Sequence, residues 1–182
     1  MPSNSSNLAT IKRLALIASL FMPIAAHAED PIDRSIIFVA ANAGLAHFDS
    51  KRHFEDRDFG GLSLGLHLNR SWSTSLFYSR SHPESGLGRN VRFENYFVQV
   101  KHYWRGESQW RPYLVGGLGE TIQDREEDRS STTAHAGLGM HYAINAKWAG
   151  QLDYRYFSAL HDGFQDKTLM TSLIYRFGTG ER

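Results

Sequence analysis

The sequence predicts an all-β fold: an eight-stranded antiparallel up-and-down transmembrane β-barrel, preceded by a cleaved signal peptide. Three observations predict it. Apolar and polar residues alternate in successive runs, the amino terminus carries an export signal, and short and long connections alternate between the runs.

The alternation is clearest in the two runs that close the chain, residues 148–159 and 168–177. In the first run Trp148, Leu152 and Tyr154 share one parity, whereas Asp153 and Arg155 share the other. Because successive side chains of a strand point to opposite faces, each run has an apolar face and a charged face. A soluble sandwich would show the same pattern with its apolar face inward, so the alternation alone does not decide between the two.

The amino terminus favours export. Residues 1–28 carry Lys12 and Arg13, then the apolar run LALIASLFMPIAA, then Ala-His-Ala before an acidic pair. This is the pattern of a secretory signal peptide, and its apolar run is too short for a membrane helix. We therefore expect a signal peptide at 1–28 and a barrel domain at 29–182.

The other predicted strands are 35–48, 61–69, 72–81, 93–104, 110–120 and 132–144. In the second of these Leu62, Leu64 and Leu66 oppose small or polar residues, as expected for lipid outside and a narrow lumen inside. The glycines of 110–120 leave its facing ambiguous. We expect an inner face of Ser, Gly, His and Gln, which would not suit the apolar ligand cavity of a lipocalin.

The connections alternate in length. Short polar links follow the second, fourth and sixth strands, and longer charged segments follow the others, including 49–60 and 122–131. Barrels of the outer membrane have short periplasmic turns and long extracellular loops. A Greek-key sandwich has no reason to keep this rhythm. The sequence therefore predicts a protein of the Gram-negative outer membrane, in contact with its lipid and lipopolysaccharide.

Composition narrows the chemistry. The chain has no cysteine, so we expect neither disulfides nor thiol chemistry, and 20 basic against 19 acidic residues give no case for a nucleic-acid partner. We expect no cofactor. We also expect no metal site, because His135 and His141 share a face but lie ~20 Å apart along a strand.

Four charged residues share the inward parity: Lys101, Asp153, Arg155 and Arg176. An eight-stranded barrel has an interior only wide enough for side chains, so buried charges there need partners. We expect a lumen charge network in which Asp153 pairs with Arg155 or with Arg176. Such a network would exclude a wide water-filled pore.

The closing segment LDYRYFSALHDGFQDKTLMTSLIYRFG resembles the last hairpin of the small OmpA-like outer-membrane β-barrels, and RPYLVGGLG resembles that family's fifth strand. The resemblance implies that Tyr175 and Phe177 form the assembly signal read by the barrel assembly machinery. Here five residues follow Phe177, whereas the family's terminal aromatic usually closes the chain. No cell-wall domain follows the barrel, so no tether to peptidoglycan is implied.

Charged extracellular segments point to a structural or surface-interaction role, such as envelope integrity or adhesion to a host or surface ligand, and not to an enzyme. The alternative is a lipid A deacylase or acyltransferase. Lipid A deacylases resemble this chain in size, and Ser158, His161 and Asp162 would then be catalytic. Those enzymes place a histidine two residues before the serine, whereas this chain has Tyr156.

Overall fold

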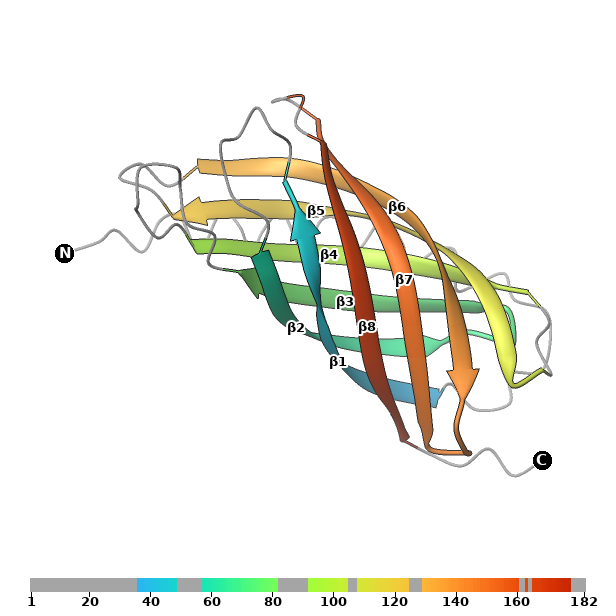
Figure 1. Ribbon diagram of the computed structural model, residues 1–182. Coiled ribbons are helices and arrows are strands. Elements are labelled where there is room, and N and C mark those ends of the chain that lie inside the picture. Colours follow the sequence, from blue (N-terminus) through green and yellow to red (C-terminus); the bar gives the residue numbers. More distant parts are fainter. Residues whose placement is uncertain are drawn as a thin grey trace.

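The computed structural model describes residues 36–48, 57–81, 92–104, 108–124, 129–160, 163 and 165–177, which form a closed barrel (Figure 1). Every strand pairs antiparallel with its neighbour, and β1 pairs with β8 to close the sheet. The predicted fold class is confirmed, while the predicted signal peptide lies outside the described residues. The strands are β1 (Ile36–His47), β2 (Arg57–His67), β3 (Trp72–Ser81), β4 (Arg92–Tyr103), β5 (Trp110–Asp124), β6 (Arg129–Ala143), β7 (Trp148–Ala159) and β8 (Gln165–Phe177).

One end of the barrel carries the short links β2–β3, β4–β5 and β6–β7, together with the start of β1 and the end of β8. Two of these links repeat one motif. The side-chain oxygen of Asn69 accepts bonds from the backbone N–H groups of Ser71 and Trp72, each at 2.8 Å. Asn145 does the same for Lys147 and Trp148, at 2.9 and 2.8 Å. Asparagine commonly stabilises tight turns in this way, and short turns mark the periplasmic end.

At the opposite end of the barrel, four strand boundaries differ from those predicted. β5 continues to Asp124 and β6 begins at Arg129, with Gln123 opposite Arg129, so most of the predicted loop 122–131 is strand. β2 likewise begins at Arg57 and β8 at Gln165, inside segments predicted as loops. The physical reason is that ladder hydrogen bonds join backbone groups, so a hairpin continues through polar residues once its register is set. The links after β5 and β7 are therefore short. The expected alternation of short and long connections does not hold at these two links.

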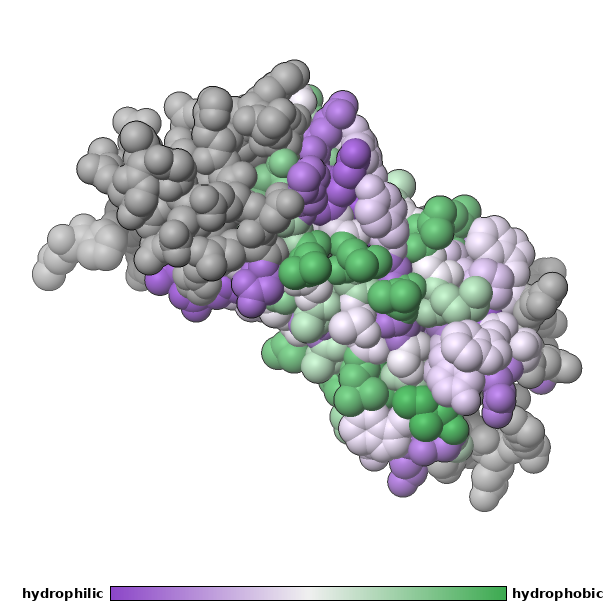
Figure 2. Space-filling view, in the orientation of Figure 1, coloured by the Kyte–Doolittle hydropathy of each residue, from purple (hydrophilic) through white to green (hydrophobic). Residues whose placement is uncertain are grey.

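The outer face is apolar, as predicted. Leu62, Leu64 and Leu138 are 64%, 54% and 63% exposed, and hydrophobic side chains gather around the middle of the barrel in Figure 2. Toward the periplasmic end the outer face carries four exposed tryptophans, a residue type enriched at membrane interfaces; they are Trp72, Trp104, Trp110 and Trp148. None of the described residues forms a helix long and apolar enough to cross a membrane.

The inner face is more varied than predicted. Serine, glutamine, histidine and charged side chains are buried there, but so are large apolar ones. The expectation that the inner face has Ser, Gly, His and Gln in place of large apolar residues was therefore wrong. The sequence signal was present in part, because Phe77 breaks the polar parity of β3. The large apolar residues of the lumen include Phe38, Phe77, Phe97, Met170 and Ile174.

Candidate functional site in the barrel lumen

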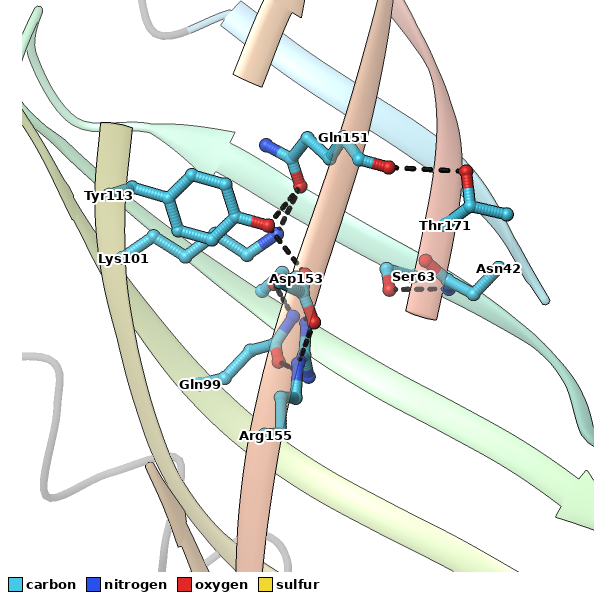
Figure 3. Close-up of polar contacts among 10 residues, drawn as sticks. Asn42, Ser63, Gln99, Lys101, Tyr113, Gln151, Asp153, Arg155 and Thr171 are labelled. Atoms are coloured by element: carbon cyan, nitrogen blue, oxygen red, sulfur yellow. Dashed lines mark hydrogen bonds and ion pairs between the residues drawn. The ribbon is translucent and has the colours of Figure 1, made fainter. Parts of the chain in front are cut away.

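An ion pair on β7 lies at the centre of the lumen. Strand alternation points Gln151, Asp153 and Arg155 inward together, and the two charged residues are only 2% and 1% exposed. Arg155 Nε lies 2.7 Å from Asp153 Oδ1, and its Nη2 donates to Oδ2 at 3.2 Å. Arg155 Nη1 donates to Gln99 Oε1 on β4 at 2.8 Å (Figure 3). The guanidinium is thus held by both a carboxylate and an amide, as a buried cation requires.

Gln151 joins this ion pair to the facing wall of the barrel. Its Oε1 accepts bonds from Lys101 Nζ at 2.5 Å and from the Tyr113 hydroxyl at 3.4 Å (Figure 3). The Tyr113 hydroxyl also donates to Asp153 Oδ2 at 2.5 Å. The other end of the Gln151 side chain donates to the Tyr103 hydroxyl at 3.1 Å. These contacts cross the lumen from β4 and β5 to β7; we call them the polar network, formed by Gln99, Lys101, Tyr103, Tyr113, Gln151, Asp153 and Arg155.

Below the polar network, the lumen continues to the periplasmic end with aromatic and basic side chains. The rings of Tyr103 and Tyr113 have centroids 5.3 Å apart, and Arg111 lies over the Tyr103 ring at 5.0 Å. Arg111 Nη2 is 2.8 Å from Nε2 of His141, whose Nδ1 is 3.0 Å from Gln151 Nε2. The hydrogen-bonded chain therefore runs from mid-lumen almost to the periplasmic turns.

Above the polar network, the lumen is filled by apolar packing. We call this the aromatic cluster, formed by Phe59, Phe77, Phe97, Phe157 and Met170. The ring of His135 packs between Phe97 and Phe157, with centroids 4.9 and 5.0 Å away. Neither ring nitrogen of His135 has a hydrogen-bond partner among the described residues. A small cavity of about 50 Å³ lies toward the extracellular end; its walls include Phe48, Phe93, Asn95 and Thr121.

The structure brings together three of the four predicted lumen charges. Lys101 is connected to the Asp153–Arg155 pair through Gln151 and the Tyr113 hydroxyl, which contacts both Gln151 and Asp153. Arg176 lies elsewhere: its Nη2 donates to the backbone oxygen of Asn145 at 3.3 Å, in the periplasmic turn. Of the two pairings that the sequence left open, Asp153 makes the one with Arg155.

The alternative catalytic set is only partly described. Ser158 lies near the end of β7 with Ala134 and Gln165 as its cross-strand neighbours, neither of which can act as a general base. His161 and Asp162 lie outside the described residues. No group of three or more His, Asp or Glu residues in the described part of the chain is placed to hold a metal ion.

The predicted assembly residues lie at the periplasmic end of β8. Tyr175 stacks edge-on against Trp148 with ring centroids 4.9 Å apart, and Phe177 lies 4.9 Å from Tyr175. Both are on the outward parity of the strand, and Phe177 is 48% exposed. They therefore form an aromatic group on the lipid side, away from the polar network.

Sequence reasoning missed Arg111 and Tyr113, which belong to the lumen. The glycines of β5 had left the facing of that strand ambiguous. The signal that would have placed these residues is the register of the β5–β6 hairpin, which sets Arg111 opposite the inward His141. Residues directly opposite in an antiparallel pair share a face, so His141 fixes the parity of the whole strand.

The comparisons with known proteins agree with this geometry. The family model of the outer membrane protein beta-barrel domain matches residues 14–177. Among solved structures, Neisserial surface protein A is similar over 78% of this chain and 97% of its own, at 17% identity and a TM-score of 0.67. The N-terminal barrel domain of Pseudomonas aeruginosa OprF covers 76% and 97%, at 16% identity and a TM-score of 0.54.

A third similar structure is Ail, the attachment invasion locus protein of Yersinia pestis, which covers 79% of this chain and 97% of its own at 19% identity and a TM-score of 0.51. No curated protein sequence matches this chain significantly. At these low identities the structural similarity shows a shared fold, and the family match covers the whole described barrel. This chain belongs to the outer membrane protein beta-barrel domain family and is a protein of the Gram-negative outer membrane.

Proposed function

We propose that this protein is a closed barrel that supports the outer membrane and meets surface ligands through its charged extracellular segments, without forming a wide pore. The observation that carries the proposal is the polar network, which crosses the lumen by direct side-chain contacts at Gln151 and Arg155. The surfaces left for interaction are then the outer wall, which contacts lipid, and the extracellular rim, which contacts ligands.

The closed lumen predicts low conductance. An ion crossing the barrel would have to displace the Arg155–Asp153 pair and the amides bonded to it, all of which are buried. Purified protein in planar bilayers should therefore show no large, stable current. A wild-type protein with steady, large single-channel conductance would contradict the closed-barrel proposal, and a known porin under the same conditions serves as the positive control.

The outer face near the extracellular rim carries polar groups among its apolar ones. Glu94 lies opposite Arg80 in the β3–β4 register and accepts hydrogen bonds from the hydroxyls of Tyr78 at 3.5 Å and Tyr96 at 3.0 Å. Lipopolysaccharide phosphates and bridging cations lie at this height in an outer membrane. Amphipathic tyrosines and paired charges suit that boundary, which supports the expected contact with lipopolysaccharide.

The extracellular segments are rich in both signs of charge, as in the sequence REED at 125–128 between β5 and β6. The similar Ail protein was solved in complex with the heparin analogue sucrose octasulfate, so a barrel of this fold can present a ligand site. We infer that the charged segments of this chain likewise recognise a charged surface or matrix ligand. Charge complementarity at such a site would set binding rate and specificity.

Adhesion assays test this inference. Cells that display the wild-type protein should bind immobilised sulfated polysaccharide or host matrix more than cells without it. Replacing Lys51 and Arg52, in the charged segment 49–60, by serine should reduce that gain, because it removes positive charge that a sulfated ligand would bind. Lys147→Ser, which removes a charge from a periplasmic turn, is the matched control and should leave binding unchanged. Equal binding by cells with and without the protein would contradict the surface-ligand role.

Three further assignments belong to the same proposal. Residues 1–28 are a signal peptide, so mass spectrometry of the mature protein should find its first residue at Glu29. Tyr175 and Phe177 are read by the barrel assembly machinery, so Phe177→Ala should lower the folded fraction in the outer membrane.

Lipid A from cells with and without the protein should have identical mass spectra, because the described neighbours of Ser158 include no base; a lost or gained acyl chain would favour the enzyme alternative.

A further inference from the structure

The periplasmic third of the lumen has an excess of positive charge. Arg111 and Arg176 both face inward there, on β5 and β8. Among the described residues, no carboxylate faces the lumen on the periplasmic side of Asp153. The carboxylate of Asp153 is itself occupied, since it binds Arg155 and Tyr113. The two guanidinium groups therefore lack an anionic partner in the described part of the chain.

These groups share one region. Arg176 lies opposite Phe38 in the β1–β8 register, and the ring of Phe38 packs on that of His67 with centroids 4.9 Å apart. The rings of His67 and Tyr103 have centroids 6.1 Å apart, and Tyr103 in turn lies 5.6 Å from His141 and under Arg111. Two like charges held together in a narrow, partly desolvated space repel each other, which favours a counterion between them.

Two buried nitrogens in this region lack a hydrogen-bond partner among the described residues. Arg176 uses Nη2 on the backbone oxygen of Asn145, but its Nε is one of the two. The other is Nε2 of His67. Buried polar atoms of native proteins are almost always satisfied, so the Arg176 Nε–H, which can only donate, points to a ligand that accepts hydrogen bonds. His67 Nε2 can donate to the same ligand in the tautomer that carries its proton there. The two nitrogens lie on β8 and β2, the two strands that flank β1, at the same end of the barrel.

We propose that the periplasmic mouth of the lumen is a binding site for a small inorganic anion, held between Arg111 and Arg176 with His67 at its edge. Guanidinium groups present several N–H donors in a plane and bind halides, phosphate and carboxylates well. The site is inside the barrel, so a free anion from the periplasm fits it better than a lipid headgroup on the outer wall. This inference does not depend on the proposed function.

The first test is anion-dependent stability. The full-length exported protein is purified in a non-ionic detergent without phosphate, with gluconate as the bulky reference anion at constant ionic strength. Replacing gluconate by chloride, or in a separate arm by phosphate, should raise the Tm by about 2–4 °C if the anion binds the folded barrel with millimolar affinity. Because no phospholipid is present, any rise comes from the free anion.

Variants locate the effect. Arg176→Gln should abolish most of the anion-dependent rise, and Arg176→Lys, which keeps the charge but loses Nε, should retain part of it. Arg80→Gln, on the outer face near the extracellular rim, is the matched control and should keep the full rise. An equal rise in Arg176→Gln and the wild type would overturn the proposal, because it would show a general salt effect. Heat-dependent gel mobility verifies that each variant is folded.

A second test needs no variant and so remains decisive if Arg176→Gln does not fold. Crystals of the wild-type protein grown with bromide should show an anomalous peak within hydrogen-bond distance of the Arg111 or Arg176 guanidinium. The absence of a peak in the periplasmic mouth would overturn the proposal, as would bromide found only on the outer surface.

Discussion

The two halves of the lumen are filled by side chains that interact in different ways. Toward the periplasm the polar network joins Lys101, Gln151 and Asp153 by directional hydrogen bonds (Figure 3). Toward the outside the aromatic cluster packs Phe97 against Phe77 and Phe157, with ring centroids 6.3 and 5.4 Å away. A narrow barrel can thus be closed either by matched polar partners or by shape. The first way depends on each partner being present, and the second depends on volume.

This difference should be visible in mutants. A polar network loses stability when one member is removed but little when matched members go together. Apolar packing loses stability in proportion to the volume removed. For each variant, the quantity to compare with the wild type is the free energy of unfolding in lipid vesicles, measured by urea titration and tryptophan fluorescence.

The largest effect should come from Asp153→Asn. The asparagine keeps the shape but leaves the Arg155 cation buried without a carboxylate, and this should cost about 3–5 kcal/mol. The double variant Asp153→Leu, Arg155→Met removes both charges and should cost less than the single variant. If the double variant were the less stable of the two, the polar network would not be governed by charge pairing.

A smaller effect is expected at the border between the halves. A Cβ atom added at Gly117 would lie 2.6 Å from the ring of His135 and 3.0 Å from Gln99 Cβ, so Gly117→Ala should crowd both regions and cost roughly 1–3 kcal/mol. The adjacent Gly116 is the matched control, because its added Cβ meets only one backbone atom, 3.8 Å away. Gly116→Ala should be neutral or slightly stabilising, and similar losses in both variants would refute the steric explanation.

In the aromatic cluster, Phe97→Leu should cost roughly 1–2 kcal/mol, because Phe97 is only 1% exposed and the smaller side chain leaves a cavity. The loss should be independent of salt. Restoring volume nearby should recover part of it, whereas changing charges in the polar network should add its own cost independently. A strong coupling between Phe97→Leu and Asp153→Asn would mean that the two halves do not act separately.

The smallest effect should come from Ser63→Ala. Asn42 Nδ2 donates to Ser63 Oγ at 2.9 Å on the β1–β2 wall, and loss of this buried acceptor should cost about 1 kcal/mol. The double variant Asn42→Ala, Ser63→Ala removes donor and acceptor together and should be closer to the wild type. A larger loss in the double variant would show that these residues act by packing.

The fold could be predicted because its main signal is local. Alternation puts Leu62 and Leu64 on one face of the sheet and Asp153 and Arg155 on the other, and the predicted signal peptide favours the reading in which the leucines meet lipid. The ends of the extracellular hairpins could not be predicted, because ladder bonds between backbone groups do not depend on side-chain polarity. The pairing Gln123 with Arg129 is such a case.

Less of the candidate site could be predicted from the sequence. The alternation of side chains along each strand predicted which charges face inward, but not their positions along the barrel axis. The β7–β8 register places Trp148 opposite Tyr175, which puts Arg176 about 20 Å along the sheet from Asp153. Parity also could not show that Phe97 and Met170 pack together in the extracellular half of the lumen. Which inward apolar residues contact one another depends on the register between strands, and the sequence of one strand does not give that register.

The ion pair at the centre of the lumen lies within a single strand, since Asp153 and Arg155 are two residues apart on β7. Each charge therefore carries its counterion along the chain before any neighbouring strand has arrived. A segment neutralised in this way presents less net charge to the bilayer while the sheet is still open. Insertion of β7 therefore does not depend on a distant residue to cancel these two charges, in contrast to Lys101 and Arg176, whose polar contacts lie elsewhere in the chain.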